Sequence, residues 1–203
     1  MIRHGLLPGL TLLEGATGSA WHTVLADMLD TPEDAMRLAR TPRGKPVMSA
    51  PAGAGFSRSH RDGLLLLGAK QDAEVGVDLE VVRDDLPLLD IADTFFATSE
   101  AAWLRAAPAR RAARFFALWT VKEAVLKASG QGITEGLAVP IRDLDELESN
   151  RPELLLGRHT VRLLLYPVDG RVVVAAIAVA RQVPRPESIR KCGVSGDGRE
   201  QRR

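Results

Sequence analysis

The chain has 203 residues and a formal net charge of +1, with 45% hydrophobic and 26% charged residues. This length and composition allow a globular protein with one large core or two small fused domains. Residues 181–203 carry seven Arg or Lys against three acidic residues, so the remainder is net acidic and gives little support to a nucleic-acid-binding function. The one cysteine, Cys192, excludes a disulfide within the chain and favours a reducing compartment.

No stretch of the sequence reads as a membrane or export segment. A membrane-spanning helix needs about 20 consecutive apolar residues, and residues 172–180 form a shorter run that suits a buried strand. Residues 6–13 are interrupted by Pro8 and Gly9 and follow little positive charge, which is untypical of a signal peptide. We therefore expect a cytoplasmic protein that binds neither membrane nor nucleic acid, and we expect it to be a monomer.

The first elements predicted, in chain order, are a strand at residues 10–14, helices at 20–29 and 32–40, and a loop of small residues at 49–55. Pro32 suits the first turn of the second helix, and Thr31 is its expected N-cap. Apolar runs at residues 64–70 and 73–82, with a tight polar turn between them, predict a β-hairpin.

Residues 84–87 interrupt this pattern and mark the expected boundary between two halves. The elements predicted after it are helices at 88–96 and 99–106, the latter with Ser99 as N-cap, a strand or turn at 141–147, and a hairpin of strands 161–167 and 171–179 around Asp169-Gly170. Both halves end in a hairpin, which is compatible with an internal pseudo-two-fold. The predicted parts are 1–84, 85–183 and a disordered tail at 184–203.

Residues 115–133 predict a central helix, because they lack proline and carry glycine only at the end, where it can cap the C-terminus. Trp119, Glu123 and Lys127 follow at intervals of four and therefore share one face. One interpretation is an ordinary surface pair of Glu123 and Lys127, worth about 0.3–0.5 kcal/mol.

Residues 74–82 alternate in the period of a half-buried strand, so Asp78 and Glu80 project from the same face, roughly 6–7 Å apart at the backbone. The alternative to a site is a solvent-facing acidic edge of an antiparallel sheet. Two carboxylates this close repel one another unless a cation or a proton lies between them. With Glu123 as a third carboxylate, they would offer a hard-oxygen site suited to Mg²⁺ and a phosphorylated substrate.

The strand at 76–80, Gly-Val-Asp-Leu-Glu, and the helix at 119–127, Trp-Thr-Val-Lys-Glu-Ala-Val-Leu-Lys, resemble in residue type, order and spacing the signature of the 4′-phosphopantetheinyl transferase superfamily. The resemblance extends to the surfactin-synthetase-activating (Sfp-like) type, which carries Gly-Lys-Pro and then a Ser-His element ahead of the strand. Here these are Lys45, within Gly-Lys-Pro, and Ser59-His60. Without the resemblance, Lys45 would read as a solvated loop residue and His60 as a surface histidine.

The chain departs from that pattern at three positions of the Ser-His element: Ser57 stands for an asparagine, Arg58 for an apolar residue and Arg61 for a second serine. The N-terminal region is also shorter than in the family, and the long basic helix ahead of Gly-Lys-Pro is missing. The residues expected to replace that helix in holding the nucleotide's 3′-phosphate are Arg37, Arg40 and Arg43.

The resemblance implies an α+β fold of two similar α/β subdomains in a pseudo-two-fold arrangement, each a small antiparallel sheet packed on a long helix. Coenzyme A would lie between them, with Mg²⁺, or Mn²⁺ in its place, on its pyrophosphate. A serine of an acyl or peptidyl carrier protein, as used in polyketide or nonribosomal peptide biosynthesis, would take the phosphopantetheine arm and release 3′,5′-ADP.

The resemblance also implies roles for individual residues. Asp78, Glu80 and Glu123 would hold the metal, and Glu123 would also accept the serine proton, directly or through water. Lys127 would pair with a phosphate oxygen near the departing nucleotide. Lys45, Ser59 and His60 would bind the nucleotide and its phosphates. The alternatives are a scaffold of the same fold that has lost turnover, and a hydrolase that acts on coenzyme A with the same site.

Overall fold

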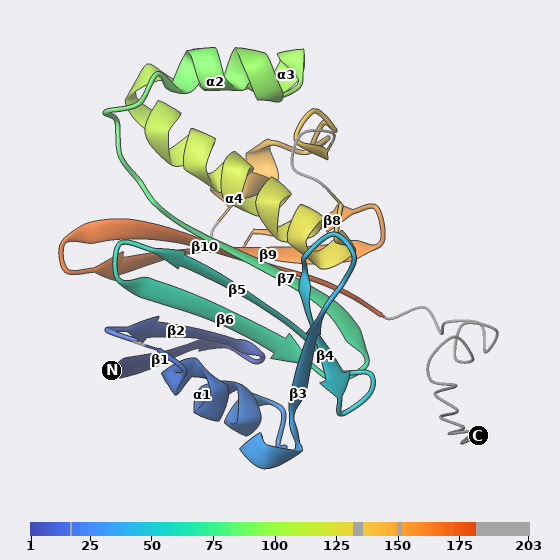
Figure 1. Ribbon diagram of the computed structural model, residues 1–203. Helices are drawn as coiled ribbons and strands as arrows, with labels where there is room; N and C mark the ends of the chain where they lie inside the picture. Colours follow the sequence, from blue (N-terminus) through green and yellow to red (C-terminus); the bar gives the residue numbers. More distant parts are fainter. Residues whose placement is uncertain (17, 132–135, 150–151, 182–203) are drawn as a thin grey trace, which may run out of the picture.

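The computed structural model describes residues 1–16, 18–131, 136–149 and 152–181 of the chain. The expected tail at 184–203 lies outside the described residues. Two four-stranded antiparallel sheets lie face to face, and each carries helices on its outer face, so that the layers run helix, sheet, sheet, helix (Figure 1). The prediction of an α+β protein built from antiparallel sheets and helices is confirmed.

The first sheet has the strand order β1-β2-β6-β5. Its strands are β1 (Ile2–Leu7), β2 (Leu10–Glu14), β6 (Leu64–Lys70) and β5 (Gly55–Arg61). Helix α1 (Ala20–Met28) covers its outer face through a core that includes Trp21, Leu25 and Phe56. The strand and helix predicted at the start of the chain are therefore confirmed. With nine residues, however, α1 is not the long helix that the resemblance implied for this half.

The second sheet has the strand order β7-β10-β9-β8. Its strands are β7 (Ala73–Val81), β10 (Arg171–Arg181), β9 (His159–Val168) and β8 (Glu153–Leu156). The predicted β9–β10 hairpin is confirmed, and its turn residues Asp169 and Gly170 both have positive φ, at 46° and 73°. Such a turn follows the twist of paired strands, which is why Asp-Gly is a strong hairpin signal.

Helix α4 (Arg111–Ser129) packs on the outer face of the second sheet and ends at Gly130, which takes the left-handed conformation predicted for a C-cap. Helices α2 (Leu88–Phe95) and α3 (Thr98–Arg105) pack on α4. Helix α3 begins at Thr98 after Ala97, so Ser99 is not its N-cap. Instead, the Glu100 carboxylate accepts a hydrogen bond from the Ala97 amide at 2.9 Å.

The predicted hairpin of residues 64–70 and 73–82 is wrong. The two strands exist, but β6 pairs with β2 and β5, whereas β7 pairs with β10 in the other sheet. Residues 64–69 are apolar on both faces, residues 73–81 are apolar on the face of Val75, Val77 and Leu79, and nearly all residues of both strands are buried. Apolar strands of this kind can stack between two sheets as well as pair side by side, and the sequence pattern does not distinguish the two arrangements.

The predicted helix at 32–40, with Thr31 as its N-cap, is also wrong. The segment forms a 3₁₀ turn, η1 (Glu33–Ala35), and then strand β3 (Arg37–Arg40), which pairs with β4 (Pro46–Ala50). Only Met36 of this stretch enters the core, so a helix here would lack the apolar face that stabilises short helices. The region at 141–147, expected as a strand or turn, holds the 3₁₀ helix η3 (Asp145–Glu148).

The core between the two sheets places β7 at the centre of the molecule. Val75, Val77 and Leu79 face the first sheet, so the alternate residues Gly76, Asp78 and Glu80 face the other way, toward α4. On its free edge, β7 lies beside β5, whose Ser57 hydroxyl accepts a hydrogen bond from the Val77 amide at 3.1 Å. The division of the chain at residue 84 stays a prediction, although β7 lies ahead of it and pairs with β10, which lies after it.

Candidate active site

Gly76 allows α4 to approach β7 closely. A Cβ atom at this position would lie 2.0 Å from the Ala124 carbonyl oxygen and 2.2 Å from the Ala128 amide nitrogen. Both atoms belong to the α4 backbone, so a side chain here would push the helix away from the strand. The first residue of the Gly-Val-Asp-Leu-Glu stretch therefore sets the distance at which residues of α4 reach Asp78.

Asp78 of β7 receives hydrogen bonds from two other elements, α4 and β5. Its Oδ1 atom accepts hydrogen bonds from Lys127 Nζ of α4 at 2.6 Å and from Ser59 Oγ of β5 at 2.9 Å. Among the residues that the structure describes, its buried Oδ2 atom has no hydrogen-bond partner. A buried carboxylate oxygen without a donor is costly, so this atom marks a place where a cation would be stabilising.

Glu80 is bound by an arginine of the neighbouring strand. Arg61 Nε donates to Glu80 Oε2 at 2.8 Å, and Arg61 Nη2 donates to Glu80 Oε1 at 2.7 Å. The hydrogen bond to Glu80 raises the pKa of Arg61 above its ordinary value. Asp78 and Glu80 are both buried, so the alternative of a solvent-facing acidic edge does not describe this strand.

Glu123 is buried and lines the same site from α4. Burial raises its pKa, the Asp78 carboxylate raises it further, Lys127 opposes the shift and Glu80 adds to it. Lys127 makes its ion pair with Asp78 of β7 and not with Glu123 of its own helix. The interpretation of Glu123 and Lys127 as a simple surface pair therefore does not hold.

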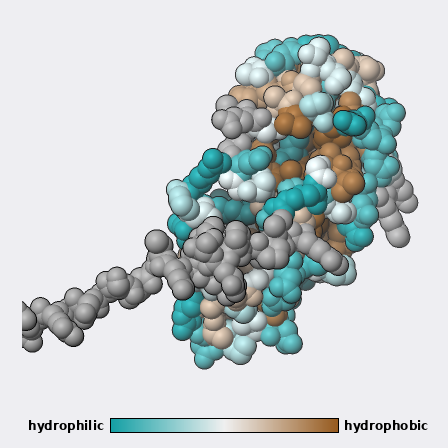
Figure 2. All heavy atoms as spheres, turned by 90° about the vertical axis from the view of Figure 1, so that its right-hand side faces the viewer, coloured by the Kyte–Doolittle hydropathy of each residue, from teal (hydrophilic) through white to brown (hydrophobic). Residues whose placement is uncertain are grey.

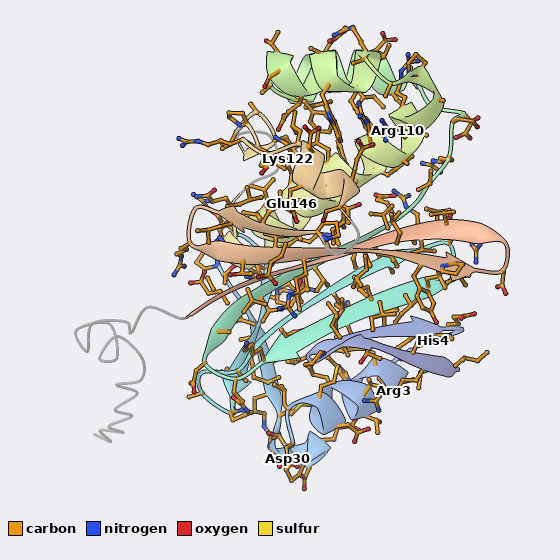
Figure 3. The ribbon with its side chains drawn as sticks, turned by 180° about the vertical axis from the view of Figure 1, so that it is seen from behind. Arg3, His4, Asp30, Arg110, Lys122 and Glu146 are labelled. Carbon is orange, nitrogen blue, oxygen red and sulfur yellow. The ribbon has the colours of Figure 1, made fainter. Side chains whose placement is uncertain are left out.

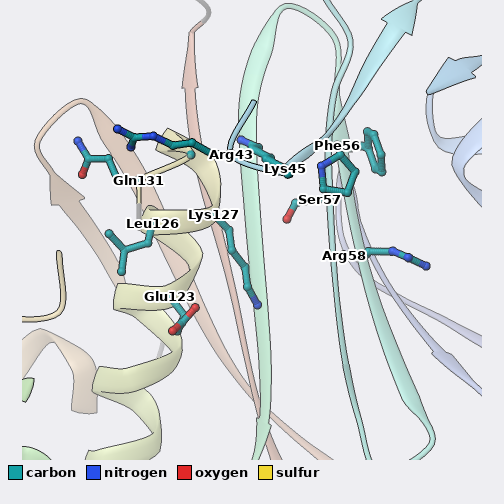
Figure 4. A pocket seen from close by; sticks show the side chains of 12 residues that line it. Arg43, Lys45, Phe56, Ser57, Arg58, Glu123, Leu126, Lys127 and Gln131 are labelled. Carbon is teal, nitrogen blue, oxygen red and sulfur yellow. The ribbon is translucent and has the colours of Figure 1, made fainter. Parts of the chain in front are cut away.

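A pocket of about 360 Å³ opens between α4, β5 and the turn before β4. Figure 4 shows Glu123 and Lys127 entering it from α4, with Ser57 and Arg58 on the strand side and Lys45 at one end. The face that Figure 2 shows carries a hydrophobic area in its upper half, edged by hydrophilic residues. The volume and the mixed lining are those of a site for a small organic molecule with charged groups.

The remaining residues predicted to bind the nucleotide are spread over different surroundings. Arg43 and Lys45 line the pocket, and Lys45 Nζ donates to the Ala128 carbonyl at 2.6 Å. Burial lowers the pKa of Lys45, against the opposing effect of Glu74. Ser59 is buried against Asp78.

His60 is exposed and is the next residue of β5, so it projects from the opposite face of the strand to Ser59. Arg37 and Arg40 lie on the exposed strand β3 and are not among the residues that line the pocket. They bond backbone carbonyls of their own region, Arg37 that of Met36 and Arg40 that of Gly44, both at 2.8 Å. Binding roles for these three residues stay predictions.

Lys122, which the sequence analysis left without a role, belongs to the core beside the site. Its Nζ atom lies 2.9 Å from Glu100 Oε2 and donates to the carbonyls of Leu137 and Val139 at 2.6 Å each. Figure 3 shows it in the half of the molecule that contains α4, away from Arg3 and His4 of the first sheet. A lysine and a glutamate with side chains only 3% and 0% exposed tie α3, α4 and the segment after 136 together.

Ser57, Arg58 and Arg61 have no role predicted from the sequence, where they stand only as departures from a family pattern. Ser57, Ser59 and Arg61 are alternate residues of β5 and all reach β7, through the hydrogen bonds to Val77, Asp78 and Glu80. Arg58 projects the other way, with its guanidinium carbon 4.7 Å from the Trp21 ring centre. A strand assignment for residues 55–61 would have revealed this alternation.

The donor chemistry of the site fits a hard divalent cation. Asp78, Glu80 and Glu123 offer only oxygen ligands, and Asp78 keeps one buried oxygen unbonded among the described residues. The three carboxylates do not form a finished ligand set, because no group of three His, Cys, Asp or Glu side chains in the described ranges stands ready to hold a metal ion. In the structure, Lys127 forms an ion pair with Asp78, and Arg61 forms one with Glu80.

The fold and the site define an α+β protein with clustered carboxylates and lysines beside an organic-molecule pocket. Residues 74–177, half of the chain, match the family described as the 4′-phosphopantetheinyl transferase superfamily. The chain belongs to this superfamily, as the two motifs predicted.

Curated relatives support the same assignment. The chain is similar to the 4′-phosphopantetheinyl transferase HetI of Nostoc sp., with 36% identity over 143 residues, which cover 68% of this chain and 58% of HetI. It is 37% identical over 117 residues to psf-1 of Bacillus pumilus, covering 57% of this chain and 48% of psf-1. It is 27% identical over 139 residues to the 4′-phosphopantetheinyl transferase of Bacillus subtilis, covering 66% and 59%. The chain thus spans about half the length of the curated relatives it matches.

No helix in the described part of the chain is both long and apolar enough to span a membrane.

Proposed function

We propose that this protein transfers the 4′-phosphopantetheine arm of coenzyme A to a serine of an acyl or peptidyl carrier protein, releasing 3′,5′-ADP. The observation that carries the proposal is a pocket lined by Glu123 and Lys127, with Lys45 at one end, beside which Lys127 forms an ion pair with Asp78. Carboxylates for a metal and lysines for phosphates are the groups that phosphoryl transfer requires, since this reaction depends on positioning and charge neutralisation.

Asp78, Glu80 and Glu123 are the residues that would hold Mg²⁺ or Mn²⁺. When bound, the ion supplies positive charge to neutralise the pyrophosphate oxygens of coenzyme A. The fit rests on the oxygen-only donor set and on the unbonded buried Oδ2 atom of Asp78.

The lysines act on the substrate's phosphates. Lys127 lies with a third of its side chain exposed to the pocket side, so its ammonium group can turn from Asp78 to a phosphate oxygen. Lys45, at the end of the pocket beside Arg43, would hold the nucleotide phosphates. Arg37, Arg40, Ser59 and His60 are assigned to nucleotide binding on the resemblance alone.

Glu123 is the proton acceptor in this proposal. The carrier serine oxygen forms a bond to the phosphorus that bears the pantetheine arm, the bond from that phosphorus to the 3′,5′-ADP oxygen breaks, and the serine proton passes to the Glu123 carboxylate. In the metal-free protein, burial and the neighbouring carboxylates of Asp78 and Glu80 raise the pKa of Glu123, while Lys127 opposes the shift.

The larger arrangement is part of the proposal. We take the two sheets with their helices as two related subdomains, divided near residue 84 and related by a pseudo-two-fold, with the pocket between α4 and β5. We also propose that the protein is a monomer that acts in the cytoplasm.

The test is intact-mass measurement of an apo carrier protein after incubation with the enzyme, Mg²⁺ and coenzyme A. A mass gain of one phosphopantetheine on the carrier supports the transferase. Free phosphopantetheine with an unmodified carrier would mean hydrolysis, and no change in either substrate would mean a non-catalytic scaffold.

A further inference from the structure

We propose that Arg61 competes with the divalent cation for Glu80 and so lowers the affinity of the metal site. This inference rests on the proposed function, because it concerns the same three carboxylates. Arg61 is the last residue of β5, and its guanidinium grips both oxygens of Glu80, at 2.8 and 2.7 Å. Both contacts come from one planar group, which is the strongest form of arginine–carboxylate pairing.

Burial makes this pair more consequential than a surface ion pair. The side chain of Glu80 is only 10% exposed, whereas that of Arg61 is 36% exposed. Water therefore reaches the arginine but hardly reaches the carboxylate, and Glu80 depends on a cation from the protein or from solution. Arginine stays charged at all ordinary pH values, so its competition with a metal does not depend on pH.

The two other carboxylates are in a different state. Asp78 gives one oxygen to Lys127 and Ser59 and keeps the other unbonded among the described residues. Glu123 faces the pocket. A cation at the site would therefore meet an unbonded oxygen of Asp78 and the carboxylate of Glu123, but would have to displace or share Arg61 to engage Glu80.

Two consequences follow for the free protein. The positive charge of Arg61 interacts with Asp78 as well as with Glu80. It therefore weakens the electrostatic attraction of the whole site for a divalent metal ion. A bound pyrophosphate would add negative charge and offset Arg61. Free metal should therefore bind weakly on its own, and more tightly once coenzyme A is present.

Mn²⁺ titration of the full chain, followed by the loss of the free-ion signal in electron paramagnetic resonance, tests the inference directly. Arg61→Ser should bind Mn²⁺ about tenfold more tightly than the wild type in the absence of coenzyme A. Arg61→Lys keeps the charge but cannot grip both oxygens, so its affinity should fall between the two. Arg162→Ser is the control, because it removes the same charge from an exposed pair with Glu153 in the second sheet.

The Glu80→Gln background distinguishes competition for Glu80 from a general change of charge. If Arg61 acts through Glu80, the gain from Arg61→Ser should shrink to less than about twofold in that background. An Arg61→Ser protein that binds Mn²⁺ no more tightly than wild type, while wild type does bind it, overturns this inference and leaves the proposed function standing. A wild-type protein that binds no Mn²⁺ with or without coenzyme A contradicts both.

Should Arg61→Ser not fold, as judged by circular dichroism, Arg61→Lys carries the test alone. Unchanged or weakened Mn²⁺ affinity in Arg61→Lys would then overturn the inference.

Discussion

At the scale of single residues, Asp78 organises the site. It is buried, and it receives its hydrogen bonds from Lys127 on a helix and from Ser59 on a strand of the other sheet. Lys127 thus has a structural partner in the metal-free protein and a proposed catalytic partner in the phosphate. The Lys127 ammonium group cannot fully serve both partners at once. In the metal-free protein it pairs with Asp78.

Lys127→Ala should destabilise the metal-free protein by about 1–3 kcal/mol, because it leaves the buried Asp78 with Ser59 as its remaining donor. The loss should fall short of that for a fully buried pair, since 33% of the Lys127 side chain is exposed. Urea unfolding with chelator and with Mg²⁺ checks this, and Mg²⁺ should recover more stability in the variant than in wild type. Lys70→Ala, an exposed lysine at the end of β6, is the control. Equal losses in the two conditions would contradict a metal at Asp78.

His159, the first residue of β9, should make stability depend on pH. Burial lowers its pKa below 6.5, as does the Arg158 guanidinium, while Glu74 opposes the shift and Lys45 adds to it. The unfolded chain then takes up the proton first, so stability falls as pH drops through about 6.5 toward the folded-state value. His159→Gln should lose less stability than wild type between about pH 7.5 and about pH 5.5 in urea unfolding. An identical loss in both proteins would show that the histidine does not contribute.

At the scale of elements, the site depends on how closely α4 lies on β7. The small residues on both sides of this contact, Gly76 on the strand and Ala124 and Ala128 on the helix, bring the two backbones together. The separation sets whether Lys127 reaches Asp78 at 2.6 Å. Gly76 thus contributes to the site without a side chain of its own.

Gly76→Ala should cost about 1–3 kcal/mol of stability, because the new methyl group meets the backbone of α4 at 2.0 and 2.2 Å. It should also slow the proposed transfer by displacing Glu123 and Lys127 from β7. Melting temperature and transfer rate on the same samples check both effects. Gly5→Ala in β1, where a Cβ would meet nothing within 4 Å, should leave both nearly unchanged. A fully stable and active Gly76→Ala protein would show that the close contact is not required.

Local signals were enough to predict several elements. Gly130 ended α4 and Asp169-Gly170 closed the β9–β10 hairpin where the turn chemistry placed them. The pairing of β6 and β7 was predicted wrongly, because two consecutive strands that each present an apolar face can stack in different sheets as well as pair in one. The helix at 32–40 was predicted wrongly from local signals alone. Only Met36 of this short stretch packs in the core, so a helix here would have no apolar face to stabilise it.

The sequence predicted that certain residues would lie near one another, but not which of them make contact. The spacing of Asp78, Glu80, Glu123 and Lys127 indicated carboxylates and a lysine on facing elements. Lys127 pairs with Asp78 because α4 packs on β7, and Arg61 pairs with Glu80 because β5 lies beside β7. Both are long-range arrangements that no local pattern encodes. The departures at positions 57, 58 and 61 were visible in the sequence, but the contacts of these side chains could be assigned only once the neighbours of β5 were known.

At the scale of the whole molecule, two sheets packed face to face bring the turn at 41–46 and strand β5 opposite α4. The pocket therefore combines residues from both ends of the fold, Arg43 and Lys45 from the first half and Glu123 and Lys127 from the second. Neither half carries the pocket alone.

Removal of divalent metal should stop the proposed transfer while leaving the protein folded, since Lys127 and Arg61 already neutralise Asp78 and Glu80 in its absence. Activity should return with Mg²⁺ or Mn²⁺, because the ligands are all oxygens. Transfer assays in chelator, followed by addition of each ion, check the first part, and circular dichroism of the same samples checks the second. Full turnover in metal-free buffer would contradict the metal site.

The most direct test of the central claim is the intact mass of an apo carrier protein after incubation with saturating coenzyme A, Mg²⁺ and either wild-type protein or Glu123→Gln. Glu123→Gln keeps the shape of the side chain but removes the charge that the metal and the serine proton both require. We predict that wild type adds one phosphopantetheine to the carrier serine and that Glu123→Gln adds none. Transfer at the wild-type rate by Glu123→Gln, or an unmodified carrier with a folded, metal-binding wild type, would contradict the assignment of this site to phosphopantetheinyl transfer.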